Sequence, residues 1–275
     1  MDDPVTNQRI EIDLLLEAIY IKYGYDFRNY SKASIRRRVR RHLSKSGLSN
    51  VSEMLHRVLY EPAFFDKLLL DLTINVTEMF RDPDFFKGLR DLVLPDLNSK
   101  SFVKVWHAGC ATGEEVYSMA ILLREGGFYK NFQIYATDTN EAVLQSAAKG
   151  IFPLARMKEY TRNYIKAGGR AGFASYYTAR YDHALMHQDL KENIVFSHHN
   201  LVTDGVFGEM NLILCRNVLI YFNRELQERV FKLFTDSLVP GGYLCLGSKE
   251  SLRLSTVRSR FESLADKKKI YRKKG

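Results

Sequence analysis

The feature of this sequence that most constrains its fold is an alternation, beginning after residue 101, between short apolar runs and helical stretches. Each apolar run ends in a polar or glycine-rich turn, which is typical of buried strands in a parallel sheet. The expected strands cover 102–107, 132–137, 194–198, 212–215 and 243–247, and the expected helices cover 114–124, 140–148 and 224–238. This order predicts an α/β protein with a doubly wound, mostly parallel sheet. The interval 150–193 breaks the rhythm, and its middle, 176–186, suggests a small antiparallel excursion.

The residues before the alternation predict a separate helical domain. Helical patterns cover 10–23, 31–43, 51–59 and 63–72, with no convincing strand among them. A length of 275 residues suits one large domain and one smaller one. We therefore expect a helical domain at 1–72, a linker at 73–84, and a sheet domain at 85–275 with an insertion at about 150–192.

Composition excludes several classes of protein. The longest apolar runs are far shorter than the ~20 residues that a membrane span needs, and the acidic N-terminus is unlike a signal peptide, so we expect a cytoplasmic protein without membrane insertion. Cys110, Cys215 and Cys245 are odd in number and show no C-x-x-C spacing. This argues against a disulfide framework or a zinc site, and we expect no metal.

The net charge of +9 is concentrated in two places. Residues 28–45 contain eight basic side chains and no acidic one, and 266–275 contain six basic and one acidic. In the first segment Ile35, Val39 and Leu43 recur at helical spacing, which predicts an amphipathic helix with its arginines facing outward. This helix is either an ordinary solvated surface or a face that meets an acidic partner; the candidate docking residues are Lys32, Arg36, Arg37, Arg40 and Arg41.

A small-residue turn, His-Ala-Gly-Cys-Ala-Thr-Gly-Glu-Glu at 107–115, connects the first expected strand to a helix. Ligands of open parallel sheets bind at the carboxyl ends of the strands, and Gly109 would allow close approach to the backbone. The turn lacks the signature of a P-loop, and Glu114 and Glu115 would repel a phosphate. Asp138 ends the next strand, where an acid accepts hydrogen bonds from ribose hydroxyls. Singly, these acids have plain structural explanations, namely helix-dipole complementation and a turn. Together they favour a nucleoside without phosphates, such as S-adenosylmethionine.

Two further segments lie near the predicted site. Residues 75–82, Asn-Val-Thr-Glu-Met-Phe-Arg-Asp, join the two expected domains. Residues 215–222, Cys-Arg-Asn-Val-Leu-Ile-Tyr-Phe, follow the fourth expected strand. Arg216 and Asn217 either cap the next helix or line the ligand site, with Tyr221 directed toward the reacting group.

In this combination and order, the motifs resemble the CheR family of chemotaxis receptor methyltransferases over nearly the whole chain. The resemblance implies a class I methyltransferase domain, which is Rossmann-like, with an all-helical N-terminal domain and an inserted antiparallel β-subdomain. It implies S-adenosylmethionine as cofactor and S-adenosylhomocysteine as product. It also implies that Arg81 and Tyr221 orient the reacting centre, and that the cofactor contacts are Asn75, Thr77, Arg81, Gly109, Glu115, Asp138, Asn200, Leu201, Arg216 and Asn217.

The implied reaction is methyl transfer to glutamate side chains of chemoreceptors, whose acidic helical methylation region would meet the arginine-rich helix. A glutamate of pKa ~4.3 is an anion at neutral pH, so no general base is needed. The insertion lacks the glycine-containing loop shared by members that tether to a receptor pentapeptide, so we expect docking without that tether. The alternatives are a nucleic-acid methyltransferase and a non-catalytic S-adenosylmethionine-binding signalling module. The first is disfavoured because no aromatic residues interleave the arginines, and we expect no nucleic-acid partner.

Overall fold

The computed structural model describes residues 4–73, 77–128 and 131–275. The chain forms two compact units: a helical unit, made of 1–75 with 221–229, and a sheet unit, made of 76–220 and 230–275. No helix in the described ranges is long and apolar enough to cross a membrane.

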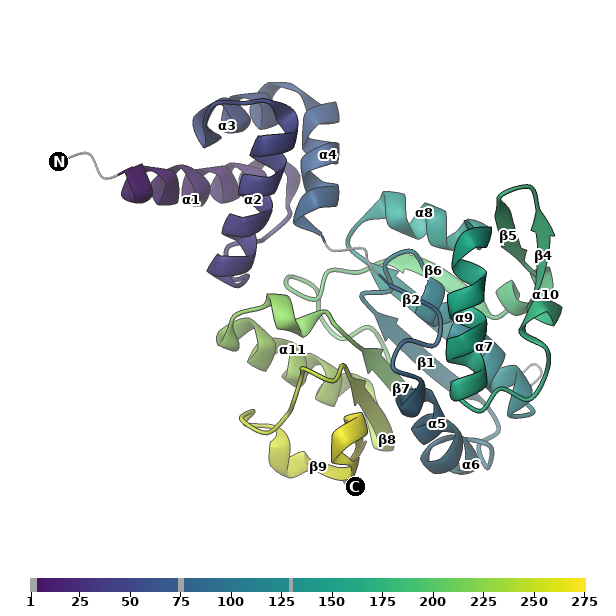
Figure 1. Ribbon diagram of the computed structural model, residues 1–275. Helices are drawn as coiled ribbons and strands as arrows, with labels where there is room; N and C mark the ends of the chain where they lie inside the picture. Colours follow the sequence, from purple (N-terminus) through teal and green to yellow (C-terminus); the bar gives the residue numbers. More distant parts are fainter. Residues whose placement is uncertain (1–3, 74–76, 129–130) are drawn as a thin grey trace. The chain divides into compact units, whose positions relative to one another are not determined.

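The helical unit is built around four helices (Figure 1), which are α1 (Pro4–Tyr23), α2 (Lys32–Ser46), α3 (Val51–Tyr60) and α4 (Pro62–Leu72). Ile35 and Val39 of α2 are buried in its apolar core and Leu43 packs against that core, as the helical spacing predicts. Gly47 ends α2 in the left-handed conformation that glycine adopts without strain. The expectation that the α2 arginines all face outward is wrong for Arg38, which is only 4% exposed. Its guanidinium stacks on an aromatic ring and donates to a backbone carbonyl of α4, which makes its burial tolerable.

The sheet unit contains a seven-stranded sheet in the order β6-β2-β1-β7-β8-β10-β9. The first five strands in that order are parallel to one another, and β10 is antiparallel to both β8 and β9. This confirms the predicted doubly wound class. The strand bounds are β1 (Val103–Ala108), β2 (Phe132–Asp138), β6 (Ile194–His198), β7 (Met210–Cys215), β8 (Leu238–Leu246), β9 (Phe261–Ala265) and β10 (Ile270–Lys273).

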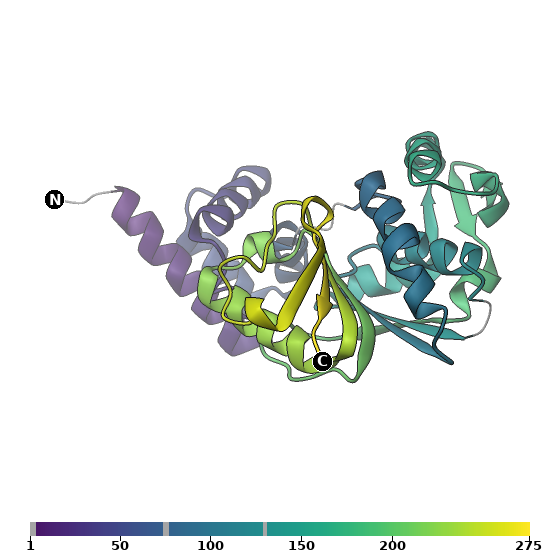
Figure 2. The same cartoon turned by 90° about the horizontal axis from the view of Figure 1, so that it is seen from below.

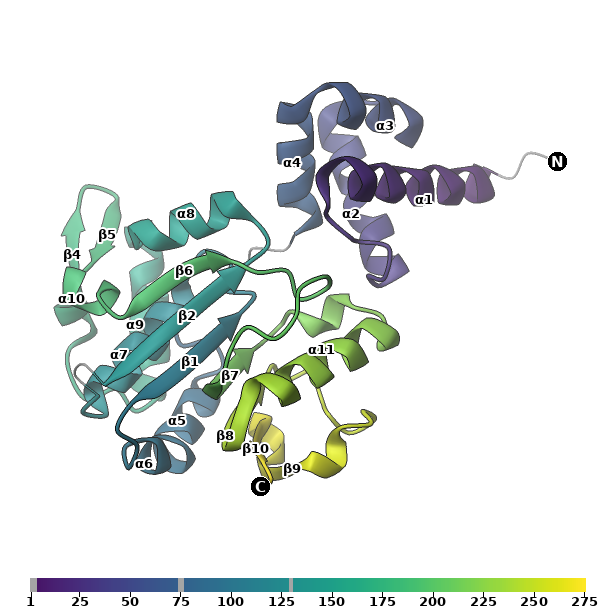
Figure 3. The ribbon, with the colours of Figure 1, turned by 180° about the vertical axis from the view of Figure 1, so that it is seen from behind.

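Helices cover both faces of this sheet, so its central strands are apolar on both sides. Comparison of Figures 1 and 3 shows α5, α7 and α9 over one face and the later part of α11, from Val230, over the other. On that second face Phe234 packs edge-on against Trp106 of β1. The helix bounds are α5 (Pro83–Leu92), α6 (Leu94–Leu97), α7 (Glu114–Glu125), α8 (Glu141–Lys149), α9 (Leu154–Lys166), α10 (Gln188–Lys191) and α11 (Arg224–Ser237).

The insertion between α8 and β6 forms a second, three-stranded antiparallel sheet in the order β3-β5-β4, as expected. Its strands are β3 (Ile151–Pro153), β4 (Tyr177–Arg180) and β5 (His183–Met186). Helix α9, which lies between β3 and β4, was not predicted from the sequence. Figure 2 shows that the insertion and the β9–β10 pair lie at opposite ends of the sheet unit. At the carboxyl edge, the strands between these two parts are followed by loops.

Candidate active site

The loops after β1, β2 and β7 meet at the carboxyl edge of the sheet, where β1 lies between β2 and β7. This is the point at which strand order reverses, and it is the usual ligand site of such folds. Gly109 has a positive φ of 77°, and a Cβ added there would lie 2.5 Å from Cγ2 of Val218 in the β7 loop. Only glycine therefore lets these two loops approach so closely.

Asp138 fastens the β1 loop to the end of β2. One carboxylate oxygen accepts a hydrogen bond of 2.9 Å from the Ala111 backbone N–H, and the other accepts one of 3.1 Å from that of Asn140. Burial raises the pKa of Asp138, while these N–H groups and that of Thr139 act to lower it. Gly109 and Asp138 are thus brought together in one loop cluster, as the sequence predicts.

Arg216 of the β7 loop is the centre of a buried ionic cluster. Its Nη1 lies 2.5 Å from Glu115 Oε2 of α7, and its Nη2 lies 2.6 Å from Asp82 Oδ2. Nη1 also donates to the Arg81 carbonyl at 3.2 Å, and the guanidinium lies 4.0 Å from the ring centroid of Phe85. The cluster therefore unites three segments that the sequence singled out: the 77–82 segment, the start of α7 and the β7 loop. It also shows that Arg216 is not a helix cap.

Two buried nitrogens in this cluster have no hydrogen-bond partner among the described residues: Arg216 Nε and His107 Nε2. His107 Nε2 lies 3.5 Å from Glu115 Oε1. Burial lowers the pKa of His107, although Glu115 acts to raise it. Unpaired buried polar atoms are costly, so each of these two nitrogens calls for an explanation.

The remaining predicted cofactor residues divide into three groups. Asn200 is held in its own turn, where its side-chain oxygen accepts from the Val202 N–H at 2.9 Å, and Leu201 is buried beside it. Thr77 lies in the described part of the first segment, half-buried, whereas Asn75 lies outside the described residues. Asn217 adopts a positive φ of 62°, and its side-chain oxygen is buried without a partner among the described residues.

Tyr221 belongs to the helical unit rather than to the sheet unit. The Arg38 guanidinium lies 4.4 Å from the centroid of its ring, and Arg38 also donates to the Leu72 carbonyl. Of the docking candidates on α2, Arg37 and Arg41 are exposed and Arg36 is half-buried. The other two are exposed but have partners on α1: Lys32 pairs with Asp13 at 2.8 Å, and Arg40 donates to Gln8.

Sequence reasoning missed two acids at the site. Asp82 pairs with Arg216, and Glu250 accepts hydrogen bonds from backbone groups of the β7 loop. Asp82 is the last residue of the 75–82 motif, and Glu250 is the only acid between Gly247 and Phe261. For Glu250 the sequence does contain a signal: an isolated acid in a basic loop that follows a strand.

Fold and site together define a class I S-adenosylmethionine-dependent methyltransferase. The chain belongs to the CheR methyltransferase family: residues 75–270 match the model described as CheR methyltransferase, SAM binding domain, and residues 10–73 match its all-alpha domain. This confirms the resemblance, the class I fold and the cofactor.

Among curated proteins, "Putative methyltransferase Cher3" of Pseudomonas putida is 53% identical over 97% of this chain and 98% of its own length. The chemotaxis protein methyltransferase of Listeria monocytogenes is 30% identical over 83% of this chain and 85% of its own. Among solved structures, the N-methyltransferase NodS from Bradyrhizobium japonicum WM9 is 14% identical, with a TM-score of 0.35 over 62% of each chain. That last similarity is too low to carry an argument.

Proposed function

We propose that this chain transfers a methyl group from S-adenosylmethionine to glutamate side chains of chemoreceptors, forming methyl esters. The observation that carries the proposal is the match to both CheR domains, with relatives that are named chemotaxis protein methyltransferases. The exposed cations of α2 support an acidic partner, because charge complementarity steers association and fixes register.

The residues at the carboxyl edge suit the proposed cofactor. A carboxylate has about four acceptor positions, and the backbone N–H groups of Ala111 and Asn140 donate to Asp138, which leaves acceptor capacity for a ribose hydroxyl. The Asn217 side-chain oxygen, Arg216 Nε and His107 Nε2 are further buried polar atoms that lack a hydrogen-bond partner among the described residues. The proposed cofactor contacts are those that the family resemblance implies.

Bound S-adenosylmethionine supplies an electrophilic methyl group on a sulfonium. Its acceptor, a glutamate carboxylate, is already ionised at neutral pH, so the chain has to align the groups and exclude water rather than remove a proton. His107 is unsuited to act as a base because it is buried and its pKa is lowered. We assign the orientation of the acceptor to Arg81 and Tyr221. The role of Tyr221 stays a prediction.

The direct test uses tritiated S-adenosylmethionine and receptor-containing membranes from the cell that makes the protein. The proposal predicts label that is released by alkali as methanol, because carboxyl methyl esters hydrolyse readily. Alkali-stable label on nucleic acid would instead indicate a nucleic-acid methyltransferase. Binding of S-adenosylhomocysteine without turnover on any receptor would indicate a non-catalytic module.

Replacing Asp138 with asparagine should raise the Kd for S-adenosylhomocysteine by about tenfold or more, since a hydrogen bond to a charged group contributes ~1.5–3 kcal/mol. Isothermal titration calorimetry measures this Kd. Glu141→Gln, an exposed carboxylate three residues away at the start of α8, is the matched control and should bind normally. Equal affinity of Asp138→Asn and the wild-type protein would contradict the ribose role.

Reversing two charges of α2, Arg37→Glu with Arg40→Glu, should raise the KM for receptor substrate by about tenfold and make methylation less sensitive to salt. The Kd for S-adenosylhomocysteine should stay within about twofold. Arg9→Glu with Lys67→Glu makes the same charge change outside α2 and should leave the KM unchanged. Equal losses of receptor methylation and cofactor affinity would refute α2 as a docking face.

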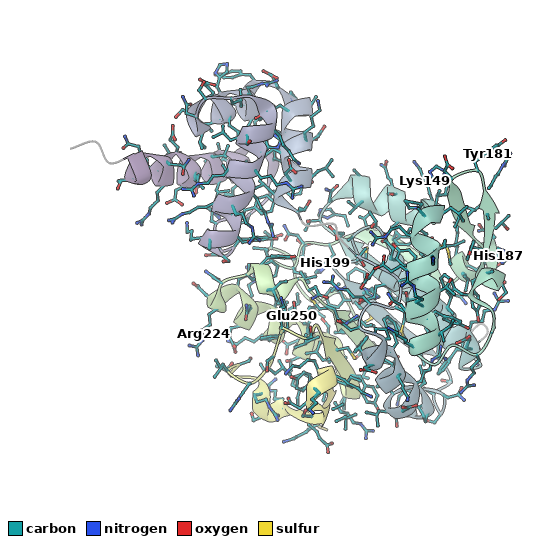
Figure 4. All side chains as sticks on the ribbon, viewed as in Figure 1. Lys149, Tyr181, His187, His199, Arg224 and Glu250 are labelled. Carbon is teal, nitrogen blue, oxygen red and sulfur yellow. The ribbon has the colours of Figure 1, made fainter. Side chains whose placement is uncertain are left out.

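The three-stranded sheet of the insertion is relevant to whether the protein binds a C-terminal pentapeptide of its receptors. The turn between β4 and β5 is formed by Tyr181 and Asp182 and contains no glycine, and Tyr181 is 85% exposed at its tip. Figure 4 shows Tyr181 directed away from the rest of the sheet unit. We expect receptors with and without a C-terminal pentapeptide to be methylated at equal rates, and a clear preference for the tethered receptors would contradict this.

A further inference from the structure

Glu250 is a buried carboxylate in the loop that follows β8, and it binds backbone rather than side chains. One oxygen, Oε2, accepts from the N–H of Gly247 at 2.6 Å and from that of Asn217 at 3.1 Å. The other, Oε1, accepts from the N–H of Ile220 at 3.3 Å. The residue is 5% exposed, and Figure 4 labels it in the interior of the sheet unit.

The segment that Glu250 holds has an uncommon backbone conformation. Asn217 has a φ of 62°, in the left-handed region, which asparagine enters more readily than other non-glycine residues but seldom adopts. Arg216, immediately before it, pairs with Glu115. Ile220, at the far end, immediately precedes Tyr221. Loss of the acceptor for its N–H groups would let this segment adopt other backbone conformations.

Burying the carboxylate of Glu250 costs more free energy than burying a neutral turn residue would. It is the only acid between Gly247 and Phe261, a stretch that also contains Lys249, Arg253, Arg258 and Arg260. Burial raises the pKa of Glu250, and the backbone N–H groups act to lower it. A carboxylate accepts from all of these donors at once, whereas an amide would place its own N–H₂ group against one of them. A buried acid that is kept despite its desolvation cost indicates that the backbone N–H groups around it need a hydrogen-bond acceptor.

We propose that Glu250 is a positioning residue for methyl transfer: it fixes the backbone from Asn217 to Ile220, and so the placement of the Asn217 side chain and of the chain entering Tyr221. The inference rests on the proposed cofactor role of Asn217 and the proposed orienting role of Tyr221. Glu250 touches neither substrate nor cofactor in this scheme and acts only through the β7 loop.

Glu250→Gln tests the two ends of the loop separately. The amide oxygen should keep the position with two donors, at Gly247 and Asn217, which leaves the N–H₂ group facing the Ile220 N–H. We expect kcat for receptor methylation to fall about 10- to 100-fold, since small misplacements of reacting groups have effects of this size. The Kd for S-adenosylhomocysteine should change less than about threefold. Hydrogen exchange should accelerate at Ile220 by at least about tenfold.

Gly247→Ala disturbs the contact between Glu250 and the Asn217 N–H by crowding it, and it leaves the carboxylate intact. A Cβ at residue 247 would lie 2.8 Å from the Asn217 nitrogen and 2.8 Å from Glu250 Oε2. Because this disturbs the Asn217 end, we expect the Kd for S-adenosylhomocysteine to rise about tenfold along with the fall in kcat. Glu125→Gln and Gly172→Ala are matched controls for the two changes; Gly172 has open space at its Cβ position.

All variants are compared at a temperature at which circular dichroism shows them folded. The inference is overturned if Glu250→Gln and Gly247→Ala retain kcat within twofold of the wild type. It is also overturned if they lose no more kcat than the controls, or if exchange at Ile220 is unchanged. A wild-type protein that binds no S-adenosylhomocysteine would refute the proposed function instead, so the two failures are distinguishable.

Discussion

Replacing Arg216 with alanine is expected to abolish measurable S-adenosylhomocysteine binding and to lower the free energy of unfolding by about 3–5 kcal/mol. The Arg216 side chain is 1% exposed and that of Glu115 is 8% exposed, so the substitution leaves a buried carboxylate without its cation. Asp82, whose side chain is 45% exposed, adds little to this loss because water screens it. Titration calorimetry and chemical denaturation measure the two effects.

The double substitution Glu115→Leu with Arg216→Met separates stability from binding at this cluster. Replacing both charges of a buried pair by hydrophobic residues of similar volume is often neutral for stability. We therefore expect the double variant to regain most of the lost free energy of unfolding while binding of S-adenosylhomocysteine stays lost. An Arg216→Ala protein with wild-type stability and affinity would show that the cluster is unimportant to both.

The second large effect is expected at Glu125, at the C-terminal end of α7, which is a purely structural site. Its buried carboxylate accepts from Arg90, from the hydroxyls of Tyr164 and Tyr176, and from the Arg170 N–H. These residues come from α5, from α9 and from the part of the insertion that follows α9. Glu125→Gln should lower the free energy of unfolding by about 3–5 kcal/mol at pH 7, because it breaks a buried ion pair.

The loss should depend on pH in a defined direction. Burial acts to raise the pKa of Glu125, but the donors around it outweigh burial and hold that pKa below its ordinary value. Stability from such a group is complete above the unfolded pKa of about 4.3 and is lost as pH falls through the folded value. The gap in free energy of unfolding between wild type and Glu125→Gln should therefore be widest near neutrality and shrink below about pH 4.

Tyr176→Phe is the control for this network, because it removes one donor and leaves the ion pair intact. It should cost about 1 kcal/mol. Urea denaturation at several pH values measures all three proteins. A gap between wild type and Glu125→Gln that stays constant from pH 7 to pH 3 would contradict the assigned role of the charge.

The sheet could be predicted because its central strands have a local signal. Val103–Ala108, Phe132–Asp138 and Met210–Cys215 are short runs that end in turn residues, and their order with the helices specifies parallel pairing. The strand Ile270–Lys273 has no such signal, because it lies among the lysines of the basic segment 266–275. Its apolar residues Ile270 and Tyr271 are nonetheless buried between β8 and β9.

The failures at the site have a different cause, which is sequence distance. Gly109 directly follows β1, Asp138 is the last residue of β2, and Glu115 lies in the first turn of the helix after β1. Their place at the carboxyl edge could therefore be inferred from the chain order. Glu250 acts on Asn217, which lies 33 residues away, and Asp82 acts on Arg216, which lies 134 residues away. Arg38 was misplaced because its helical neighbours Arg37 and Arg41 are exposed, and nothing local distinguishes the arginine that stacks on Tyr221.

The position of β10 also has a consequence for biosynthesis. Among the strands of the described residues this one is translated last, yet it lies between β8 and β9 rather than at an edge of the sheet. While the polypeptide is still emerging from the ribosome, β8 exposes a row of unsatisfied backbone groups that invites pairing with other nascent chains. The pairing of β8 with β10 can form only after residue 273 has been translated. A chaperone would therefore matter most in the interval between the synthesis of β8 and the synthesis of β10.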